Sequence, residues 1–312
     1  MRIVHLSDIH IWRYVANPLH LFNKRIVGIA SLLAGRAARF RLERMDDVVE
    51  RILSLHPDHV LITGDLTTTA LPAEFQEARR ALQPLLEDPH RATVIPGNHD
   101  RYTLGSVRSR SFEAVFGSFS SSTTYPWLRS LDDRTSILGL DATRSHLSAK
   151  GRLPATQLDA MKQLLANWAG DRLIVASHYP VAAPALYARE LFAKRMVNAS
   201  QVIDVLKNVG PHIFCCGHVH AAWAFLPEEV PGELCLNAGA PLLRDETGHR
   251  APGFLQIDIE GEGVTVIHQA WTGEGWEERP FASEPHFFQG VKRLKNPRGV
   301  QGYTEINRDF GL

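Results

Sequence analysis

The chain has 312 residues, which is enough to bury a large core without disulfides, and we expect one large domain with extensions. Its 34 Lys and Arg residues balance 34 Asp and Glu residues, so the formal net charge is zero. This balance argues against a broadly basic nucleic-acid-binding protein and against an acidic disordered chain. Three cysteines are too few for a disulfide framework, so we expect buried thiols in a reducing compartment.

The amino terminus predicts a strand rather than a leader peptide. Ile3–Leu6 is short and apolar and is not preceded by a charged leader with a long apolar stretch. The longest apolar run, residues 26–35, is shorter than the roughly 18 residues that a membrane-spanning helix needs. We therefore expect a cytoplasmic protein without a spanning helix.

Hydrophobic periodicity predicts alternating strands and helices. The predicted strands cover residues 3–6, 59–63, 92–95, 136–140, 173–176, 212–216, 234–236, 254–259 and 264–268. The predicted helices cover residues 46–55, 72–86, 156–165 and 200–208, with a bend at Pro84 in the second. The alternation indicates an α/β fold, the final run of strands indicates a mixed sheet, and the composition from about Thr272 predicts a loosely structured tail.

Polar residues follow five of the predicted strands. In chain order the five motifs are Ser7-Asp8-Ile9-His10, Gly64-Asp65, Gly97-Asn98-His99-Asp100, Ser177-His178 and Gly217-His218-Val219-His220. The carboxyl ends of strands form the ligand crevice of an open α/β sheet, so these loops can converge although they span more than 200 residues.

The residue types at these strand ends suit two divalent metal ions. Asp8 and His10 are two positions apart, and in extended backbone they would point the same way; His218 and His220 repeat the spacing. Imidazole with carboxylate favours Zn, Fe or Mn, and the lack of cysteine argues against a structural zinc site. Glycine precedes three of the motif residues, at Gly64, Gly97 and Gly217, as a turn with unusual φ or close backbone approach requires.

In this order and spacing, the five motifs resemble those of the calcineurin-like metallophosphoesterases, over roughly residues 2–241. The resemblance implies a four-layer αββα sandwich of two mixed sheets in residues 1–270, followed by an extension over 271–312. It implies that one metal ion is held by Asp8, His10, Asp65 and His220. It implies that a second is held by Asp65, Asn98, His178 and His218, with Asp65 as the bridge.

The same resemblance implies a phosphoester hydrolase. In two-metal chemistry a bridging hydroxide attacks phosphorus in line while both ions stabilise the phosphoryl oxygens. His99 would assist the leaving oxygen, and Asp100 would either hold the imidazole of His99 in the right tautomer or act as a turn residue that bonds its own backbone. Arg101 could grip a second phosphate, and Tyr102 and Tyr179 could stack on a base or sugar.

An unusual segment, residues 17–45, separates the first motif from the first core helix. Its apolar residues recur at helical spacing, and six Lys and Arg residues stand against one acid, Glu43. Such a segment either packs on the body with a charged outer face or contacts lipid at the inner membrane surface. It resembles the insertion of bacterial enzymes that cleave UDP-2,3-diacylglucosamine, so a lipid-linked nucleotide is one candidate substrate.

Three other hypotheses remain beside that substrate. A cyclic-nucleotide phosphodiesterase carries the same motifs, although such relatives are more compact near the amino terminus. A DNA exonuclease of the same superfamily is disfavoured by the zero net charge, and nucleic acid is an unlikely partner. A non-catalytic docking module on this fold is disfavoured because all seven candidate ligands and His99 are present.

Overall fold

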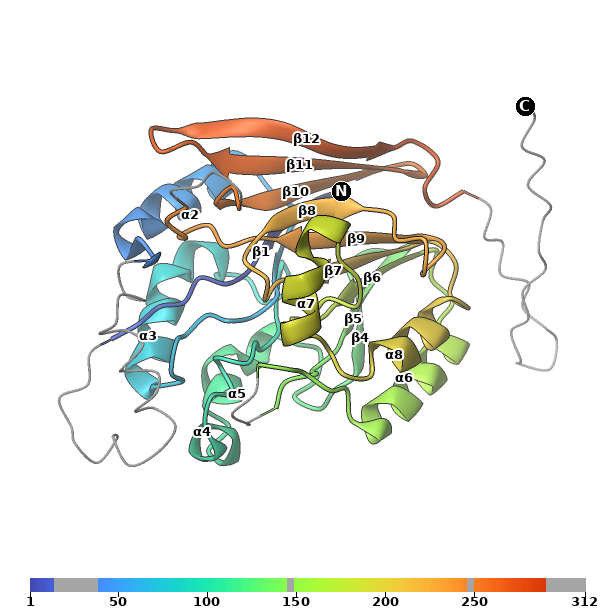
Figure 1. The fold of residues 1–312 in the computed structure, drawn as a ribbon, viewed down its shortest axis with the longest axis horizontal. Coiled ribbons are helices and arrows are strands. Elements are labelled where there is room, and N and C mark those ends of the chain that lie inside the picture. Colours follow the sequence, from blue (N-terminus) through green and yellow to red (C-terminus); the bar gives the residue numbers. More distant parts are fainter. Residues whose placement is uncertain (14–38, 145–148, 246–249, 290–312) are drawn as a thin grey trace.

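The computed structural model describes residues 1–13, 39–144, 149–245 and 250–289. Its first sheet has six strands in the order β12-β11-β10-β1-β2-β3 (Figure 1). The bounds are β1 (Arg2–Leu6), β2 (His59–Ile62), β3 (Ala92–Val94), β10 (Gly253–Glu260), β11 (Gly263–Trp271) and β12 (Trp276–Glu284). The strands β1, β2 and β3 are parallel and the others antiparallel, so the sheet is mixed, as predicted.

The second sheet also has six strands, in the order β4-β5-β6-β7-β9-β8. The bounds are β4 (Trp127–Ser130), β5 (Thr135–Gly139), β6 (Arg172–Ala176), β7 (His212–Cys216), β8 (Ala222–Phe225) and β9 (Glu233–Ala238). Its inner strands β5, β6, β7 and β9 are parallel, and the edge strands β4 and β8 are antiparallel. The sequence did not predict β4 or β8, which are short edge strands with partly exposed residues.

Helices cover the outer face of each sheet (Figure 1). The helices on the first sheet are α2 (Met45–Ser54), α3 (Pro72–Ala81) and α5 (Ser111–Phe116). Those on the second are α6 (Ala155–Asn167) and α8 (Ala199–Leu206), and two short helices are α4 (Leu104–Arg108) and α7 (Ala188–Lys194). The helix predicted over 72–86 ends at Ala81, and a 3-10 turn with Pro84 follows, in keeping with the predicted bend.

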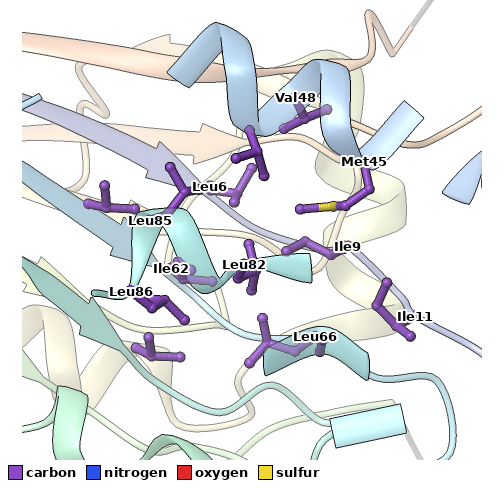
Figure 2. Close-up of a cluster of buried hydrophobic side chains, with 14 of the residues drawn as sticks. Leu6, Ile9, Ile11, Met45, Val48, Ile62, Leu66, Leu82, Leu85 and Leu86 are labelled. Atoms are coloured by element: carbon purple, nitrogen blue, oxygen red, sulfur yellow. The ribbon is translucent and has the colours of Figure 1, made fainter. Parts of the chain in front are cut away.

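Strand periodicity explains why the two sheets stack. In β1, Val4 and Leu6 belong to the apolar cluster under the helices, whereas Ile3 belongs to the cluster between the sheets. In β6, Val175 belongs to the apolar cluster under the helices of the second sheet, and Ile174 belongs to the cluster between the sheets. Because successive side chains point to opposite faces, fully apolar strands of this kind require cover on both sides. The result is the expected four-layer αββα sandwich, and Figure 2 shows part of the helix-side core of the first sheet.

Two predictions outside the core need comment. Loose structure from about Thr272 is wrong for residues 276–284, which form β12 and pair with β11 along its length. Of segment 17–45, the part up to residue 38 lies outside the described residues. The described end packs on the body, since Phe40 and Arg44 are buried and Met45 begins α2.

The structure also bears on the membrane and cysteine predictions. Among the described residues, no helix combines the length and apolar character needed to cross a bilayer. Cys215, Cys216 and Cys235 are free thiols within the apolar core, as expected for buried cysteines.

Candidate metal centre

Five strand-end loops converge where the two sheets meet. Adjacent parallel strands β1, β2 and β3 of the first sheet, and β6 and β7 of the second, each deliver one motif. Their ends bring together Asp8, His10, Asp65, Asn98, His178, His218 and His220. The convergence predicted from the strand ends is therefore present, although the residues span more than 200 positions of the chain.

The first group of donors surrounds the Nε2 atom of His10. That nitrogen lies 3.0 Å from Nε2 of His220 and 3.6 Å from Oδ2 of Asp65. The His220 nitrogen lies 3.2 Å from Oδ1 of Asp8. The four side chains Asp8, His10, Asp65 and His220 thus form one potential ligand set.

The second group is centred on Nε2 of His178. This nitrogen lies 3.3 Å from Oδ2 of Asp65, 3.2 Å from Oδ1 of Asn98 and 3.2 Å from Nδ1 of His218. Oδ2 of Asp65 approaches both His10 and His178, so one carboxylate oxygen joins the two groups.

These atoms fit divalent metal ions by distance and by chemistry. Donors about 2.0–2.2 Å from a shared ion are separated by about 3.0–3.6 Å in octahedral or tetrahedral geometry, which is the spacing seen here. Oδ1 of Asp8 is buried and has no hydrogen-bond partner among the described residues, as expected of an oxygen reserved for an ion. The donor set of carboxylate, amide and imidazole suits Mn, Fe or Zn.

The backbone at the ligands is strained. Of the nine non-glycine residues with positive φ in the described chain, five are candidate ligands: Asp8, His10, Asp65, His218 and His220. The extended backbone expected around Asp8 and His10 is therefore wrong, because both have left-handed φ values, 56° and 54°. Non-glycine residues adopt this region at a cost, and such strain concentrates at functional sites.

Glycines make room for these loops. A Cβ atom at Gly217 would collide with the side chains of Ser7 and Asp8, and one at Gly97 would collide with Asp65. The predicted close backbone approach at these glycines is confirmed.

Backbone carbonyls fix the orientation of two ligand rings. Nδ1 of His178 donates to the carbonyl oxygen of Thr63 at 2.7 Å, and Nε2 of His218 donates to that of Ala149 at 3.0 Å. In the neutral ring each bond places the hydrogen on the bonded nitrogen and leaves the lone pair of the opposite nitrogen aimed at the centre, the arrangement typical of metal-binding histidines. Asn237, at the end of β9, donates to the carbonyl of Gly217 at 2.5 Å and so supports the turn that carries His218.

Asp65 stays ionised in this buried environment. Burial alone would raise its pKa, but the neighbouring rings of His178, His99 and His10 outweigh burial and hold the pKa well below the usual range. Burial works against the charged form of His178 too, yet Asp65 raises the pKa of that ring to about 9. Burial, together with His178, lowers the pKa of His218 well below its usual value. An ionised carboxylate among imidazoles is what a bridging metal ligand requires.

His99 lies beside the ligand groups with a defined tautomer. Its backbone N–H donates to Oδ1 of Asp65 at 2.8 Å, and its Nδ1 donates to the carbonyl of Thr68 at 2.7 Å. The ring stacks on Tyr102, with centroids 5.4 Å apart and planes inclined by 14°. With a hydrogen held at Nδ1, a proton on Nε2 makes the ring a cation.

Of the two roles expected for Asp100, the contacts in the structure are those of the turn residue. Its carboxylate accepts bonds from the backbone N–H groups of Gly97, Thr67 and Leu66, at 2.9, 2.9 and 3.3 Å. Asp100 therefore holds together the loops after β2 and β3, and it is Thr68 that sets the tautomer of His99. An Asp in a turn binds backbone N–H groups in this way because its short side chain reaches them.

Three other expectations for the loops are revised. Arg101 is 8% exposed, and its guanidinium donates to Glu113 and to Asp141, so it braces two loops rather than facing a substrate phosphate. Tyr102 and Tyr179 are buried: Tyr102 stacks on His99, and Tyr179 contacts the ligand ring of His218 at a centroid distance of 4.5 Å. Both tyrosines thus support the centre instead of lining an open pocket.

Comparison with known proteins places this geometry in a family. A model of the calcineurin-like phosphoesterase family matches residues 1–222, the region that contains all seven candidate ligands. The chain belongs to the calcineurin-like phosphoesterase family. It is accordingly a metal-dependent phosphoester hydrolase, and the complete ligand set agrees with that activity.

Two curated relatives are phosphodiesterases. The chain is 26% identical over 265 residues to a probable cyclic nucleotide phosphodiesterase of Rhodococcus erythropolis, covering 80% of this chain and 81% of the relative. It is 28% identical over 184 residues to the glycerophosphodiester phosphodiesterase GpdQ of Enterobacter lignolyticus, covering 58% of this chain and 57% of the relative.

Solved structures share the fold. A dimetal phosphatase from Danio rerio superposes with a TM-score of 0.58 at 13% identity, covering 90% of this chain and 99% of that one. A purple acid phosphatase from yellow lupin, Lupinus luteus, gives a TM-score of 0.61 at 12% identity, covering 98% of this chain and 57% of that one. At such low identity the likeness concerns the architecture, which is the two-sheet sandwich described above.

Proposed function

We propose that this enzyme is a phosphodiesterase with a dinuclear centre of Mn, Fe or Zn and that its substrate is a small phosphodiester such as a cyclic nucleotide. The observation that carries the proposal is the shared oxygen of Asp65, which lies 3.6 Å from the His10 donor and 3.3 Å from the His178 donor. The relative from Rhodococcus erythropolis supports the choice of a cyclic nucleotide, since it is similar over most of both chains.

The proposed ligand sets follow the two groups of side chains. Asp8, His10, Asp65 and His220 hold one ion, and Asp65, Asn98, His178 and His218 hold the other. When bound, two ions of this kind supply an activated water and positive charge for the phosphoryl oxygens. The protein's part is to keep Asp65 ionised and to hold the rings of His178 and His218 through the carbonyls of Thr63 and Ala149.

His99 is the proposed group for the leaving oxygen. Because Thr68 holds the hydrogen at Nδ1, the protonated ring presents its second hydrogen from Nε2. Donation of that proton to the leaving oxygen completes cleavage of the P–O bond, and the cation stabilises negative charge before transfer. Tyr102 keeps the ring plane fixed by stacking.

A panel of substrates tests the proposal. The protein, reconstituted with Mn²⁺ or Zn²⁺, is assayed on bis-p-nitrophenyl phosphate, 3′,5′-cyclic AMP and glycerophosphoethanolamine, with p-nitrophenyl phosphate as the monoester control. We expect metal-dependent cleavage of diesters with a higher kcat/KM than that of the monoester. Metal binding without turnover of any diester would overturn the proposal.

A second candidate substrate is a lipid-linked nucleotide such as UDP-2,3-diacylglucosamine, with peripheral contact to the inner membrane. One observation favours it. Phe40, near the end of segment 17–45, packs against two ligand rings, with its centroid 4.7 Å from that of His10 and 5.8 Å from that of His220. The described end of the segment therefore lies directly beside the metal ligands, and in this candidate the segment is the part that binds the acyl chains.

The structure sharpens the test of this second candidate. Deletion of all of 17–45 would remove Phe40, Arg44 and Met45, which are buried, and would damage the core. Replacement of residues 17–38 alone by a short Gly-Ser linker keeps those three residues. If this variant loses cleavage of UDP-2,3-diacylglucosamine but keeps cleavage of cyclic AMP, the segment binds the lipid; if wild type ignores the lipid substrate, this candidate fails.

A further inference from the structure

Helix α7 contributes almost nothing to the apolar core. None of its seven residues is buried, and in Figure 1 it lies apart from the pair α6 and α8 that covers the second sheet. The preceding turn, Ala185–Tyr187, is attached to the body by Tyr187, whose ring stacks on Trp223 at a centroid distance of 5.3 Å. Most helices in globular proteins are stabilised by burying an apolar face, so a short helix that does not must be held by other contacts.

Those other contacts attach α7 to the turn that carries two proposed metal ligands. Glu190 accepts bonds from Lys194 at 2.8 Å and from Arg250 at 2.7 Å. The same Arg250 donates to the carbonyl of Val219, the residue between His218 and His220, at 2.5 Å. The helix is therefore fixed to the rim of the metal centre and not to the hydrophobic core.

The residues that follow α7 are also joined to the segment around Gly151, through an isolated β-bridge between Gly151 and Met196. The N–H of Gly151 donates to the carbonyl of Arg195, and the N–H of Val197 donates to that of Gly151, at 3.2 and 2.9 Å. Two positions before Gly151, the carbonyl of Ala149 accepts the bond from the ring of His218. The segment around Gly151 thus contacts the ring of His218, and α7 is linked through Arg250 to the turn that carries His218.

An aromatic ring of α7 is exposed and has two cations near it. Phe192 of α7 is 65% exposed. The guanidinium carbon of Arg195 lies 4.0 Å from its ring centroid, and Nζ of Lys150 lies 6.0 Å from it. Exposure of one apolar side chain is ordinary, but an exposed aromatic ring with cations beside it favours an occupant with both a flat ring and negative charge.

We propose that Phe192, with Lys150 and Arg195, forms a platform that binds the nucleobase of a nucleotide substrate while its phosphodiester lies at the metal centre. This inference rests on the proposed function and assigns its substrate class. Any nucleobase can stack on an exposed aromatic ring, because every base has a flat π face. The two cations favour the anionic nucleotide over a neutral molecule. Phe192 is then a specificity-determining residue and not a catalytic one.

Product binding provides the sharpest test, because it does not require turnover. The dissociation constants of AMP and of ribose 5-phosphate, which share the phosphate and differ by the base, are measured by calorimetry on the Mn²⁺-loaded protein. We expect wild type to bind AMP about five- to 100-fold more tightly than ribose 5-phosphate, the range expected for one stacked base. Phe192→Ala should bring this ratio close to one, and Phe192→Trp should keep it.

The matched control is Leu186→Ala. Leu186 is 78% exposed in the turn just before α7, and its substitution shortens an exposed apolar side chain without removing an aromatic ring. It should leave the ratio unchanged. An equal ratio in wild type and Phe192→Ala, or a wild-type ratio of one, would overturn the platform. Hydrolysis of bis-p-nitrophenyl phosphate by the same wild-type preparation separates the two failures. If this diester is cleaved and Phe192→Ala leaves the ratio of dissociation constants unchanged, only the platform is wrong. If no diester is cleaved, the proposed function is wrong.

Discussion

The loops at the metal centre and the hairpins of the β10–β11–β12 meander handle backbone conformation in opposite ways. At the centre, left-handed φ values fall on five Asp and His ligands as well as on Gly64, and a Cβ atom at Gly64 or Gly217 would collide with its neighbours. In the meander the positive φ values fall on Gly261 and Gly273, and a Cβ at either would meet nothing within 4 Å. The turns of the meander are therefore relaxed and open, whereas the ligand loops are strained and crowded.

This difference separates where the fold gains stability from where it performs chemistry. The long antiparallel pairing of β10, β11 and β12 needs no unusual residue beyond its turn glycines. The ligand loops hold unfavourable conformations because carboxylates, carbonyls and glycines on several loops fix them together. Substitutions at the centre should therefore cost activity and metal binding, and those in the meander should cost only stability.

The largest effect is expected from loss of the shared carboxylate. Asp65→Ala removes an oxygen from both ligand groups, and since the contribution of bound metal is several kcal/mol, kcat/KM should fall by at least about 10⁴-fold. The metal content, measured by mass spectrometry of the purified protein, should fall below two ions per chain. Two tightly bound ions in the variant would show that Asp65 does not bridge.

His99→Ala should separate chemistry from metal binding. The variant should keep both ions but lose about 10²–10⁴-fold in kcat, because the group that protonates the leaving oxygen is gone. Comparison of cyclic AMP with a bis-p-nitrophenyl substrate sharpens the test, since the better leaving group needs less proton donation and should lose less. A full rate on both substrates would exclude His99 from the reaction.

Two glycines compare the regions directly. Gly217→Ala should weaken metal binding by about 10–100-fold, because its new methyl group collides with Ser7 and Asp8 and displaces the support of the ligands. Gly273→Ala, the matched control, should lower the free energy of unfolding by about 1 kcal/mol through its left-handed φ and leave metal affinity unchanged. Equal metal affinity in the two variants would contradict the difference between the crowded ligand loops and the open turns of the meander.

The smallest effect concerns pH and the meander. His268 of β11 is buried, and burial, assisted by Arg279, lowers its pKa to about 4. The unfolded chain, with an ordinary pKa of about 6.5, binds the proton more readily, so the stability associated with neutral His268 is complete above about pH 6.5 and is lost as pH falls toward 4. The loss should be about 2 kcal/mol at pH 5.

Urea unfolding at pH 8 and at pH 5 measures this effect. His268→Leu should make the decrease between the two pH values smaller than in wild type, since both ring nitrogens lack a hydrogen-bond partner among the described residues and Leu needs none. His59, whose pKa burial lowers to about 3, should contribute a similar decrease that persists in the variant. An identical pH dependence in wild type and His268→Leu would show that His268 is not neutral when folded.

Much of the fold was accessible from the sequence because its strands are strongly apolar and its turns carry Gly, Asn and Asp. The strands β1, β2 and β7 and the helices α2 and α8 were predicted within a few residues. The edge strands β4 and β8 and the last strand β12 were missed. Edge strands alternate weakly because one side is exposed, and β12 is rich in charged residues, so only pairing with a neighbour reveals them.

The sequence by itself determined which side chains could bind metal, because Asp, Asn and His in these motifs are distinctive and follow apolar strands. Only the tertiary structure decided how they are oriented. The carbonyls of Thr63, Thr68 and Ala149 hold the rings of His178, His99 and His218, and every residue has a carbonyl, so such contacts leave no signal in the sequence. The attachment of Glu190 to Arg250, 60 residues apart, likewise exists only once the chain has folded.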